Sequence, residues 1–124
     1  MYYKSKNKID LGKLGEGVAK KYLLSAGYEM VGCNCRFGHL EIDIIASFKG
    51  RLVFFEVKTR STKYLELDEE NLKRKQIKNL KKAIGLYCYY KKINVEKISL
   101  DFLMIMVNTK RKMVDIKHYK NILF

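Results

Sequence analysis

Two neighbouring apolar segments of this chain carry charged residues at alternate positions. Glu41 and Asp43 lie two residues apart in the first segment, and Glu56 and Lys58 lie two residues apart in the second. Alternate residues of a β-strand point to the same face, so each pair is expected on one face of a strand. Charges among apolar neighbours are costly unless they are paired or bound to a cation, which makes these four residues candidates for a site.

The chemistry that suits these residue types is metal-assisted hydrolysis of a phosphodiester. If the two segments form a hairpin, Asp43 and Glu56 can reach one ion, and their hard oxygens suit Mg²⁺ or Mn²⁺. Lys58 can position the attacking water or neutralise charge that develops at phosphorus. A surface hairpin with solvated charges or a cross-strand Glu–Lys pair is the alternative that spacing alone leaves open.

The hairpin itself is predicted from local sequence. Residues 40–46 and 51–58 are rich in β-formers, and Lys49-Gly50 between them supplies a turn. Apolar residues recur at helical spacing over 11–26, after the N-cap candidate Asp10 and before Gly27, which ends the helix.

The rest of the chain predicts a second amphipathic helix and further strands. The helix covers residues 72–87 after an acid-rich start at 68–71, and strands are expected at 98–107 and 113–119. Residues 30–38 predict a short strand, and residues 1–9 a flexible arm. The fold class is α/β (α+β), a single domain over residues 1–124 with a mixed central sheet flanked by helices.

The charge balance points to a polyanionic partner. The chain has 26 Lys and Arg against 13 Asp and Glu, a net charge of +13, although a Lys-rich composition can also produce this surplus. Phosphate contacts are expected from one face of the second helix and from the strand before it. The nucleic-acid-binding candidates are Arg60, Lys73, Arg74, Lys75, Lys78 and Lys82. A solvated helix face is the alternative.

The aromatic, cysteine and histidine residues outside these segments give weaker indications of function. Tyr89 and Tyr90 either stack on bases or lie at a dimer surface, and Tyr87 is expected in the core. The pair Cys33 and Cys35 is too closely spaced for a tetrahedral zinc site without a second pair, so no zinc is expected. We expect His118 at the surface.

No targeting or membrane segment is visible in the sequence. The N-terminal residues lack an apolar stretch, and the longest apolar run, 102–107, is far shorter than a membrane span. With three cysteines and no secretion signal, reduced thiols and a cytoplasmic location are expected, with no membrane partner.

The two charged segments together resemble a known family. The run Glu41-Ile42-Asp43-Ile44-Ile45-Ala46, followed by Phe54-Phe55-Glu56-Val57-Lys58-Thr59-Arg60, resembles the YraN-type family of the restriction-endonuclease-like, PD-(D/E)xK superfamily. Gly15-Glu16 is similar to the first helix of that family, and the family is related in fold to Holliday-junction resolvases. One departure is Leu40, where the family usually has glycine before the first acid.

The resemblance implies a restriction-endonuclease-like core and assigns roles residue by residue. Asp43 and Glu56 match the metal-binding acids, Lys58 matches the catalytic lysine, and Glu16 matches an acid that many relatives bring from the first helix. Glu41 is an additional acid behind the metal ligands. Helical spacing allows this role for Glu16, because it falls at the border of the apolar stripe near Leu23.

The function expected from these observations is a divalent-metal-dependent endonuclease, with Mg²⁺ or Mn²⁺ as cofactor and duplex or structured DNA as substrate. A homodimer would supply two sites for cutting two strands. The alternatives are a non-catalytic nucleic-acid-binding module with a relic metal site and a basic RNA-associated protein of ribosomal type. The carboxylates discriminate between these functions, since acids that face phosphate only weaken binding unless a metal lies between them.

Overall fold

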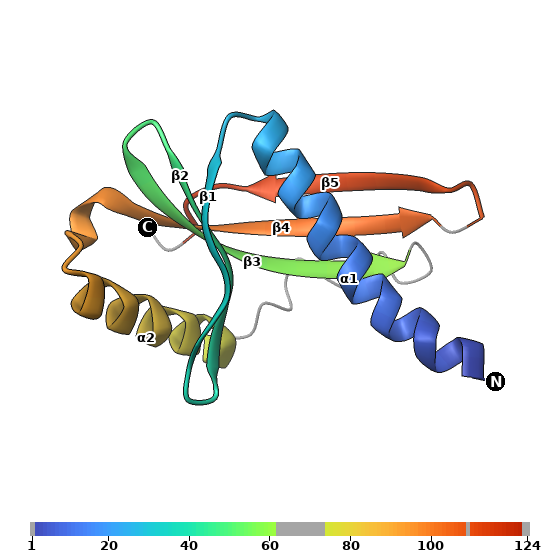
Figure 1. The fold of residues 1–124 in the computed structure, drawn as a ribbon, viewed down its shortest axis with the longest axis horizontal. Coiled ribbons are helices and arrows are strands. Elements are labelled where there is room, and N and C mark those ends of the chain that lie inside the picture. Colours follow the sequence, from blue (N-terminus) through green and yellow to red (C-terminus); the bar gives the residue numbers. More distant parts are fainter. Residues whose placement is uncertain (1, 62–73, 109, 123–124) are drawn as a thin grey trace.

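The structure is a computed structural model that describes residues 2–61, 74–108 and 110–122, without the side chains of residues 2–10 and 74–75. The described residues form two α-helices, one 3-10 helix and five strands, and Figure 1 shows their arrangement. In chain order these are α1 (Tyr2–Ser25), β1 (Glu29–Phe37), β2 (Leu40–Phe48), β3 (Arg51–Ser61), α2 (Arg74–Lys91), η3 (Val95–Lys97), β4 (Ile98–Asn108) and β5 (Met113–Tyr119).

The five strands form one mixed sheet in the order β1-β2-β3-β4-β5. β3 and β4 are parallel, and the other neighbouring pairs are antiparallel. A parallel pair needs a long crossover connection, and the segment that contains α2 supplies it. The predicted mixed sheet with flanking helices is therefore confirmed.

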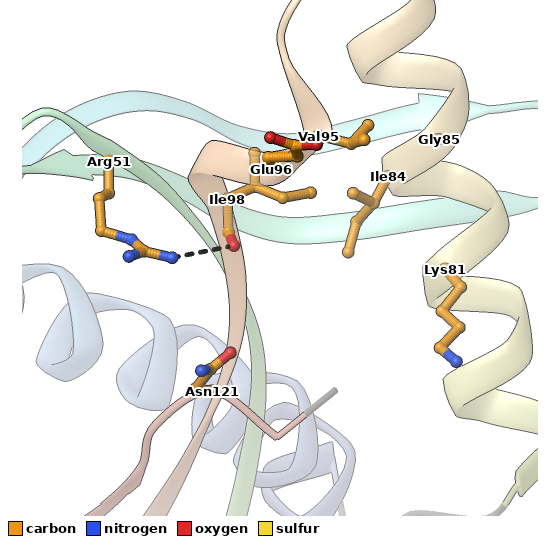
Figure 2. Close-up of a pocket in the computed structure, with 8 residues that line it drawn as sticks. All are labelled: Arg51, Lys81, Ile84, Gly85, Val95, Glu96, Ile98 and Asn121. Atoms are coloured by element: carbon orange, nitrogen blue, oxygen red, sulfur yellow. Dashed lines mark hydrogen bonds between the residues drawn. The ribbon is translucent and has the colours of Figure 1, made fainter. Parts of the chain in front are cut away.

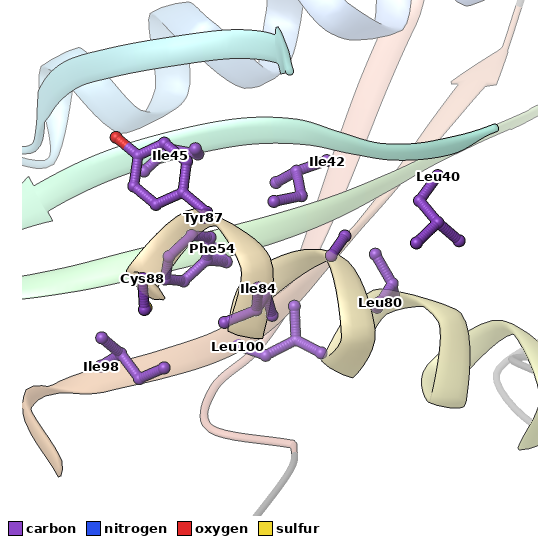
Figure 3. Close-up of a cluster of buried hydrophobic side chains, with 11 residues drawn as sticks. Leu40, Ile42, Ile45, Phe54, Leu80, Ile84, Tyr87, Cys88, Ile98 and Leu100 are labelled. Atoms are coloured by element: carbon purple, nitrogen blue, oxygen red, sulfur yellow. The ribbon is translucent and has the colours of Figure 1, made fainter. Parts of the chain in front are cut away.

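The two helices cover opposite faces of the sheet, as adjacent residues of β3 show. Phe54 packs in the core beneath α2, where Tyr87 meets its ring edge-on at 5.6 Å (Figure 3). Phe55 packs in the core beneath α1, against Ala19 and Leu23. Both phenylalanines are fully buried, and Tyr87 is buried in the core as predicted.

The strands agree with the prediction more closely than the helices do. α2 begins at Arg74 within the described residues, and its predicted start over 68–73 lies outside them. α1 ends as expected before Gly27, whose φ is +96°. At its other end, the predicted flexible arm over 1–9 is corrected, because residues 2–9 continue the helix. That stretch contains no glycine or proline to end a helix, and its lysines are good helix formers.

The β2–β3 hairpin turns on two residues with left-handed backbone. Lys49 has φ of 48° and Gly50 has φ of 79°, the combination that a tight two-residue hairpin turn requires. From this turn the β2–β3 pairing runs from Phe48 opposite Arg51 to Ile44 opposite Phe55.

Beyond Ile44, β2 separates from β3 and pairs with β1 alone. β1 continues beside β2 to the Phe37–Leu40 pair, whereas β3 continues beside β4 to Ser61. The side-chain alternation of β2 changes at the same place, since Ile42 packs in the α2 core and Ile44 packs in the α1 core. The strands therefore diverge at residue 43.

Candidate active site

Asp43 lies at the point where β2 leaves β3. Its carboxylate takes the place of a strand partner, since the backbone N–H of Val57 donates to Asp43 Oδ2 at 2.8 Å. Burial raises the pKa of Asp43 to about 7, and the neighbouring Glu56 carboxylate adds to the rise. The hydrogen bond from Val57 acts in the opposite direction, because it stabilises the ionised form.

Glu56 is the second acid of this site, and it is 7% exposed. It is close enough to Asp43 for the two carboxyl groups to share a hydrogen bond. Lys58 Nζ lies 3.4 Å from Glu56 Oε2, and Gln76 Nε2 donates to the same oxygen at 2.6 Å. The structure therefore brings Asp43, Glu56 and Lys58 together, as the sequence predicted.

Gln76 is the residue of this site that the sequence analysis missed. It lies in the first turns of α2, four residues before Leu80 and seven before Ala83, and both of these are buried. A polar residue on the extended apolar stripe of an amphipathic helix is the signal that could have identified it. Its amide anchors the start of α2 to the acid on β3.

Glu16 reaches the same place from α1. One cleft of about 340 Å³, here called the acidic cleft, lies between the first half of α1 and the end of β3. It is lined by Leu11, Gly12, Glu16, Asp43, Val57, Lys58, Thr59 and Arg60. The position that the resemblance implied for Glu16, in one site with Asp43 and Lys58, agrees with this cleft.

Gly15 allows α1 to approach β3 this closely. A Cβ added at Gly15 would overlap the hydroxyl of Thr59 and lie 2.8 Å from its Cβ, so rotation of the Thr59 side chain alone would not make room and α1 and β3 would have to move apart. The neighbouring residue on the helix is Glu16, and the neighbouring residue on the strand is Lys58. The missing side chain of Gly15 therefore sets the separation across the acidic cleft.

Asp43 also borders a second cleft, of about 210 Å³, on the side of α2. Glu56, Gln76 and Glu41 contribute to it. Glu41 lies at its rim, where Arg36 Nε is 3.7 Å from Glu41 Oε2. Glu41 is therefore an additional acid beside the Asp43–Glu56 pair rather than a part of it.

The donor set fits a hard divalent cation. Lys58 pairs with Glu56 alone of the two acids, so ionisation of both Asp43 and Glu56 leaves a negative charge that a bound cation would neutralise. Within the ranges that the structure describes, no three His, Cys, Asp or Glu side chains are grouped closely enough to hold a metal by themselves. Two carboxylates with water in the remaining positions is the usual environment of Mg²⁺.

The predicted phosphate-binding residues divide into three groups. Arg60 lines the acidic cleft, and Lys78 and Lys82 are exposed on α2. Arg74 and Lys75 lie in the first turn of α2, but their side chains are outside the described part, and Lys73 lies outside the described residues altogether.

His118 is not at the surface, which corrects the expectation from sequence. Its side chain is 7% exposed, and Nε2 lies 2.7 Å from Asp101 Oδ2. The other ring nitrogen, Nδ1, accepts from or donates to the hydroxyl of Tyr22 at 2.7 Å. The burial arises because α1 packs over the end of β5, a long-range contact that a position near the C-terminus does not reveal.

A larger cavity of about 650 Å³ lies elsewhere, between α2 and the start of β3 (Figure 2). Lys81 and Ile84 line it from α2, and Arg51 faces them and donates to the Ile98 carbonyl oxygen at 3.4 Å. Among the side chains that the structure describes, Glu96 is the one acid that lines it, and no predicted site residue does. Size therefore does not identify the site in this protein, whereas the carboxylates do.

No helix in the described residues is long and apolar enough to cross a membrane.

Among solved structures, the chain is similar to the crystal structure of a FdxN element excision controlling factor protein from Anabaena variabilis. The TM-score is 0.41 at 13% sequence identity, over 86% of this chain and 98% of that chain.

Comparison with known sequences gives a family. A UPF0102 protein of Flavobacterium psychrophilum is 35% identical over 112 residues, which cover 90% of this chain and 92% of the relative. One from Natranaerobius thermophilus is 33% identical over 93% of this chain and 98% of the relative. One from Oleidesulfovibrio alaskensis is 43% identical over 79 residues, and the match spans 64% of this chain but 39% of that longer relative.

The family model described as "Uncharacterised protein family UPF0102" matches residues 15–115, a range that begins one residue before Glu16 and includes Asp43, Glu56 and Lys58. This match confirms the YraN-type resemblance of the two charged segments. The chain belongs to the UPF0102 family.

Proposed function

We propose that this protein is a divalent-metal-dependent endonuclease that hydrolyses phosphodiester bonds in duplex or structured DNA. The observation that carries the proposal is the meeting of Asp43, Glu56 and Lys58 where β2 and β3 diverge, with Lys58 3.4 Å from Glu56. Glu16, on α1, lines the acidic cleft together with Asp43 and Lys58.

Each of these residues has a role that follows from its position. Asp43 and Glu56 hold a Mg²⁺ or Mn²⁺ ion, and Gln76 fixes the Glu56 carboxylate by a hydrogen bond of 2.6 Å. The ion supplies charge neutralisation at phosphate and a lower pKa for bound water. Lys58, whose side chain is 28% exposed, reaches both Glu56 and solvent, so its ammonium group can orient water beside the phosphate.

The reaction is hydrolysis, in which the water oxygen forms a bond to phosphorus and the bond from phosphorus to the leaving sugar oxygen breaks. The water loses one proton and the leaving oxygen gains one, so the products are a phosphomonoester and a free hydroxyl. Glu16 contributes a carboxylate to the side of the cleft that faces Lys58, where it can orient water or a hydrated ion.

DNA binding in this proposal is mainly electrostatic. The net charge of +13 attracts polyanions, and Arg60 at the cleft with Lys78 and Lys82 on α2 contacts phosphates. Affinity should fall steeply with added salt and depend little on base sequence. A homodimer would provide the second site for the second strand, and sedimentation of the purified protein measures this directly.

The test compares Lys58→Ala with Lys97→Ala, which removes an exposed lysine from η3. The substrates are linear, nicked, flapped and four-way-junction DNA and structured RNA, each with Mg²⁺ or Mn²⁺. Loss of a positioned catalytic group commonly lowers the rate by about 10²-fold or more. We expect Lys58→Ala to lose most cleavage and to keep most DNA affinity, and Lys97→Ala to retain both.

Two results would contradict the proposal in different ways. If the wild-type protein cuts no substrate with either metal but binds DNA, the function is that of a non-catalytic binding module. If Lys58→Ala cuts as fast as the wild type, the active site lies elsewhere in the chain.

A further inference from the structure

Three aromatic side chains gather near the end of α2, two of them exposed and the third, Phe37, half-buried against the α2 core. Tyr89 and Tyr90 are 77% and 67% exposed, and their rings meet edge-on with centroids 5.4 Å apart. The ring of Phe37, at the end of β1, lies 6.4 Å from that of Tyr90 with planes only 5° apart. Large exposed aromatic residues grouped in this way mark an interaction surface, here called the aromatic platform.

Basic residues adjoin the platform along the chain. Lys91 and Lys92 follow the two tyrosines and are exposed, and Arg36, which precedes Phe37, has a side chain that is 72% exposed. A second copy of this chain docked on the platform by twofold symmetry would bring these like charges together, which is unfavourable. A polyanion with flat rings is complementary to both the charge and the aromatic surface.

One residue of the platform, Phe37, lies on the same β1–β2 hairpin as Glu41 and Asp43. In the β1–β2 register, Phe37 pairs with Leu40, and Arg36 pairs with Glu41. Leu40 and Glu41 line the cleft on the α2 side, together with Asp43 and Glu56. A chain that leaves this cleft along the hairpin therefore meets Arg36 first and Phe37 next.

We propose that the aromatic platform binds the bases of a single-stranded segment of nucleic acid by stacking. Aromatic rings beside cations hold single strands in this way, with little dependence on sequence. Bases within a duplex are already stacked on each other and do not offer their faces. For the substrate, the inference means that unpaired nucleotides flank the bond that is cut, and this part rests on the proposed function. The binding of single strands rests on the aromatic platform alone.

The test measures binding of a labelled 12-nucleotide oligo-dT by fluorescence anisotropy in EDTA, so that no cleavage occurs. The double variant Tyr89→Leu/Tyr90→Leu removes both rings, and the matched Tyr89→Phe/Tyr90→Phe keeps them. Loss of one base stack weakens binding about 5- to 150-fold. The Leu variant lacks two rings, so its affinity for oligo-dT should be at least about 5-fold lower than that of the wild type. The Phe variant should bind oligo-dT as the wild type does. The affinity of either variant for a 12-base-pair duplex should fall by less than threefold.

Three outcomes would overturn the inference. The first is equal oligo-dT affinity in the Leu variant and the wild type. The second is an equal loss on single strand and duplex, which would indicate a general effect on the fold. The third is conversion of a dimer to a monomer in sedimentation with oligo-dT affinity unchanged, which would make the platform a protein interface.

The same assay separates this inference from the proposed function. Lys58→Ala should keep most of its affinity for oligo-dT, since it leaves the platform intact. If no substrate is cut but only the Leu variant loses single-strand binding, the platform is confirmed and the endonuclease is not. If cleavage depends on Lys58 while the Leu variant binds normally, the platform is wrong and the endonuclease stands.

Discussion

The backbone N–H of Val57 donates a hydrogen bond to the side chain of Asp43, 14 residues earlier, at a distance of 2.8 Å. A strand backbone at this position would normally pair with a neighbouring strand, but β2 has already separated from β3. Asp43 therefore completes the β3 hydrogen bonding with its side chain, and this holds its carboxyl group near that of Glu56.

The first prediction concerns the pH dependence of folding in the absence of metal. The pKa of Asp43 is raised to about 7 from 3.8, so the folded state holds a proton that the unfolded state has lost between these values. The contribution of Asp43 to stability is therefore full below about pH 4 and is lost as the pH rises through 7. Asp43→Asn, which does not titrate, should gain stability relative to the wild type across this window.

The gain should reach on the order of 2–4 kcal/mol above pH 7 and should be small at pH 4. Urea unfolding of both proteins in EDTA at several pH values gives the difference directly. A difference that stays constant from pH 4 to pH 8 would show that Asp43 is not the buried, proton-sharing acid described above.

The second prediction concerns metal. Mn²⁺ at about 100 times its Kd should stabilise the wild type by about 2.7 kcal/mol, whereas Asp43→Ala should not respond. Because binding requires ionised Asp43, Mn²⁺ affinity should fall as the pH is lowered below about 7. Thermal unfolding with and without Mn²⁺ at pH 5.5 and pH 8 measures both effects. Asp115→Ala, which removes an exposed acid on β5, is the matched control, and an equal response in Asp43→Ala would place the ion elsewhere.

The third prediction concerns the closeness of α1 to β3. Gly15→Ala places a methyl group against the side chain of Thr59, so α1 and β3 must move apart, which separates Glu16 from Lys58. We expect a fall in cleavage of about 10²-fold, the usual cost of misplacing a catalytic group by about 1 Å. Gly17→Ala is the control, because a Cβ there meets nothing within 4 Å and alanine favours a helix by about 1 kcal/mol.

Cleavage rates and urea unfolding of the two alanine variants distinguish the possible results. The Gly17 variant should be as active as the wild type and at least as stable. If Gly15→Ala retains full cleavage, Glu16 does not act across the acidic cleft.

The fourth prediction concerns the buried hydrogen bonds of His118. Tyr22→Phe removes the hydroxyl that lies 2.7 Å from His118 Nδ1 and should cost about 1 kcal/mol of unfolding free energy. Tyr89→Phe removes a hydroxyl from a side chain that is 77% exposed and should change stability by less than about 0.5 kcal/mol. Chemical denaturation at pH 7 compares the two, and an equal effect would show that the Tyr22 hydrogen bond contributes nothing specific.

The part of the site that could be predicted from sequence depends on local rules. Strand alternation, together with the Lys49-Gly50 turn, places Asp43 on one strand and Glu56 and Lys58 on the next. The family resemblance then adds Glu16, which no local pattern connects to them. In the structure, Glu16, Asp43 and Lys58 line the acidic cleft, and Glu56 lines the second cleft, which Asp43 also borders.

The part that could not be predicted depends on contacts between distant segments. Gln76 meets Glu56 only because the α2 crossover returns over the sheet, and Gly15 is informative only once Thr59 is known to lie beneath it. Burial of His118 depends on Tyr22 and Asp101, which are remote from it in sequence. No repeating pattern in the sequence around Gln76, Gly15 or His118 indicates which distant residue each of them contacts.

The pairing of Tyr22 with His118 joins residues that are 96 positions apart, and it has a consequence for the time at which the protein matures. Translation produces α1 before β5, so the nascent chain carries Glu16 while the strand that anchors Tyr22 has not yet been made. The complete set of contacts that holds α1 over the sheet exists only after residue 118 has emerged. Until then, the Tyr22–His118 hydrogen bond cannot help to hold α1, and with it Glu16, at the acidic cleft.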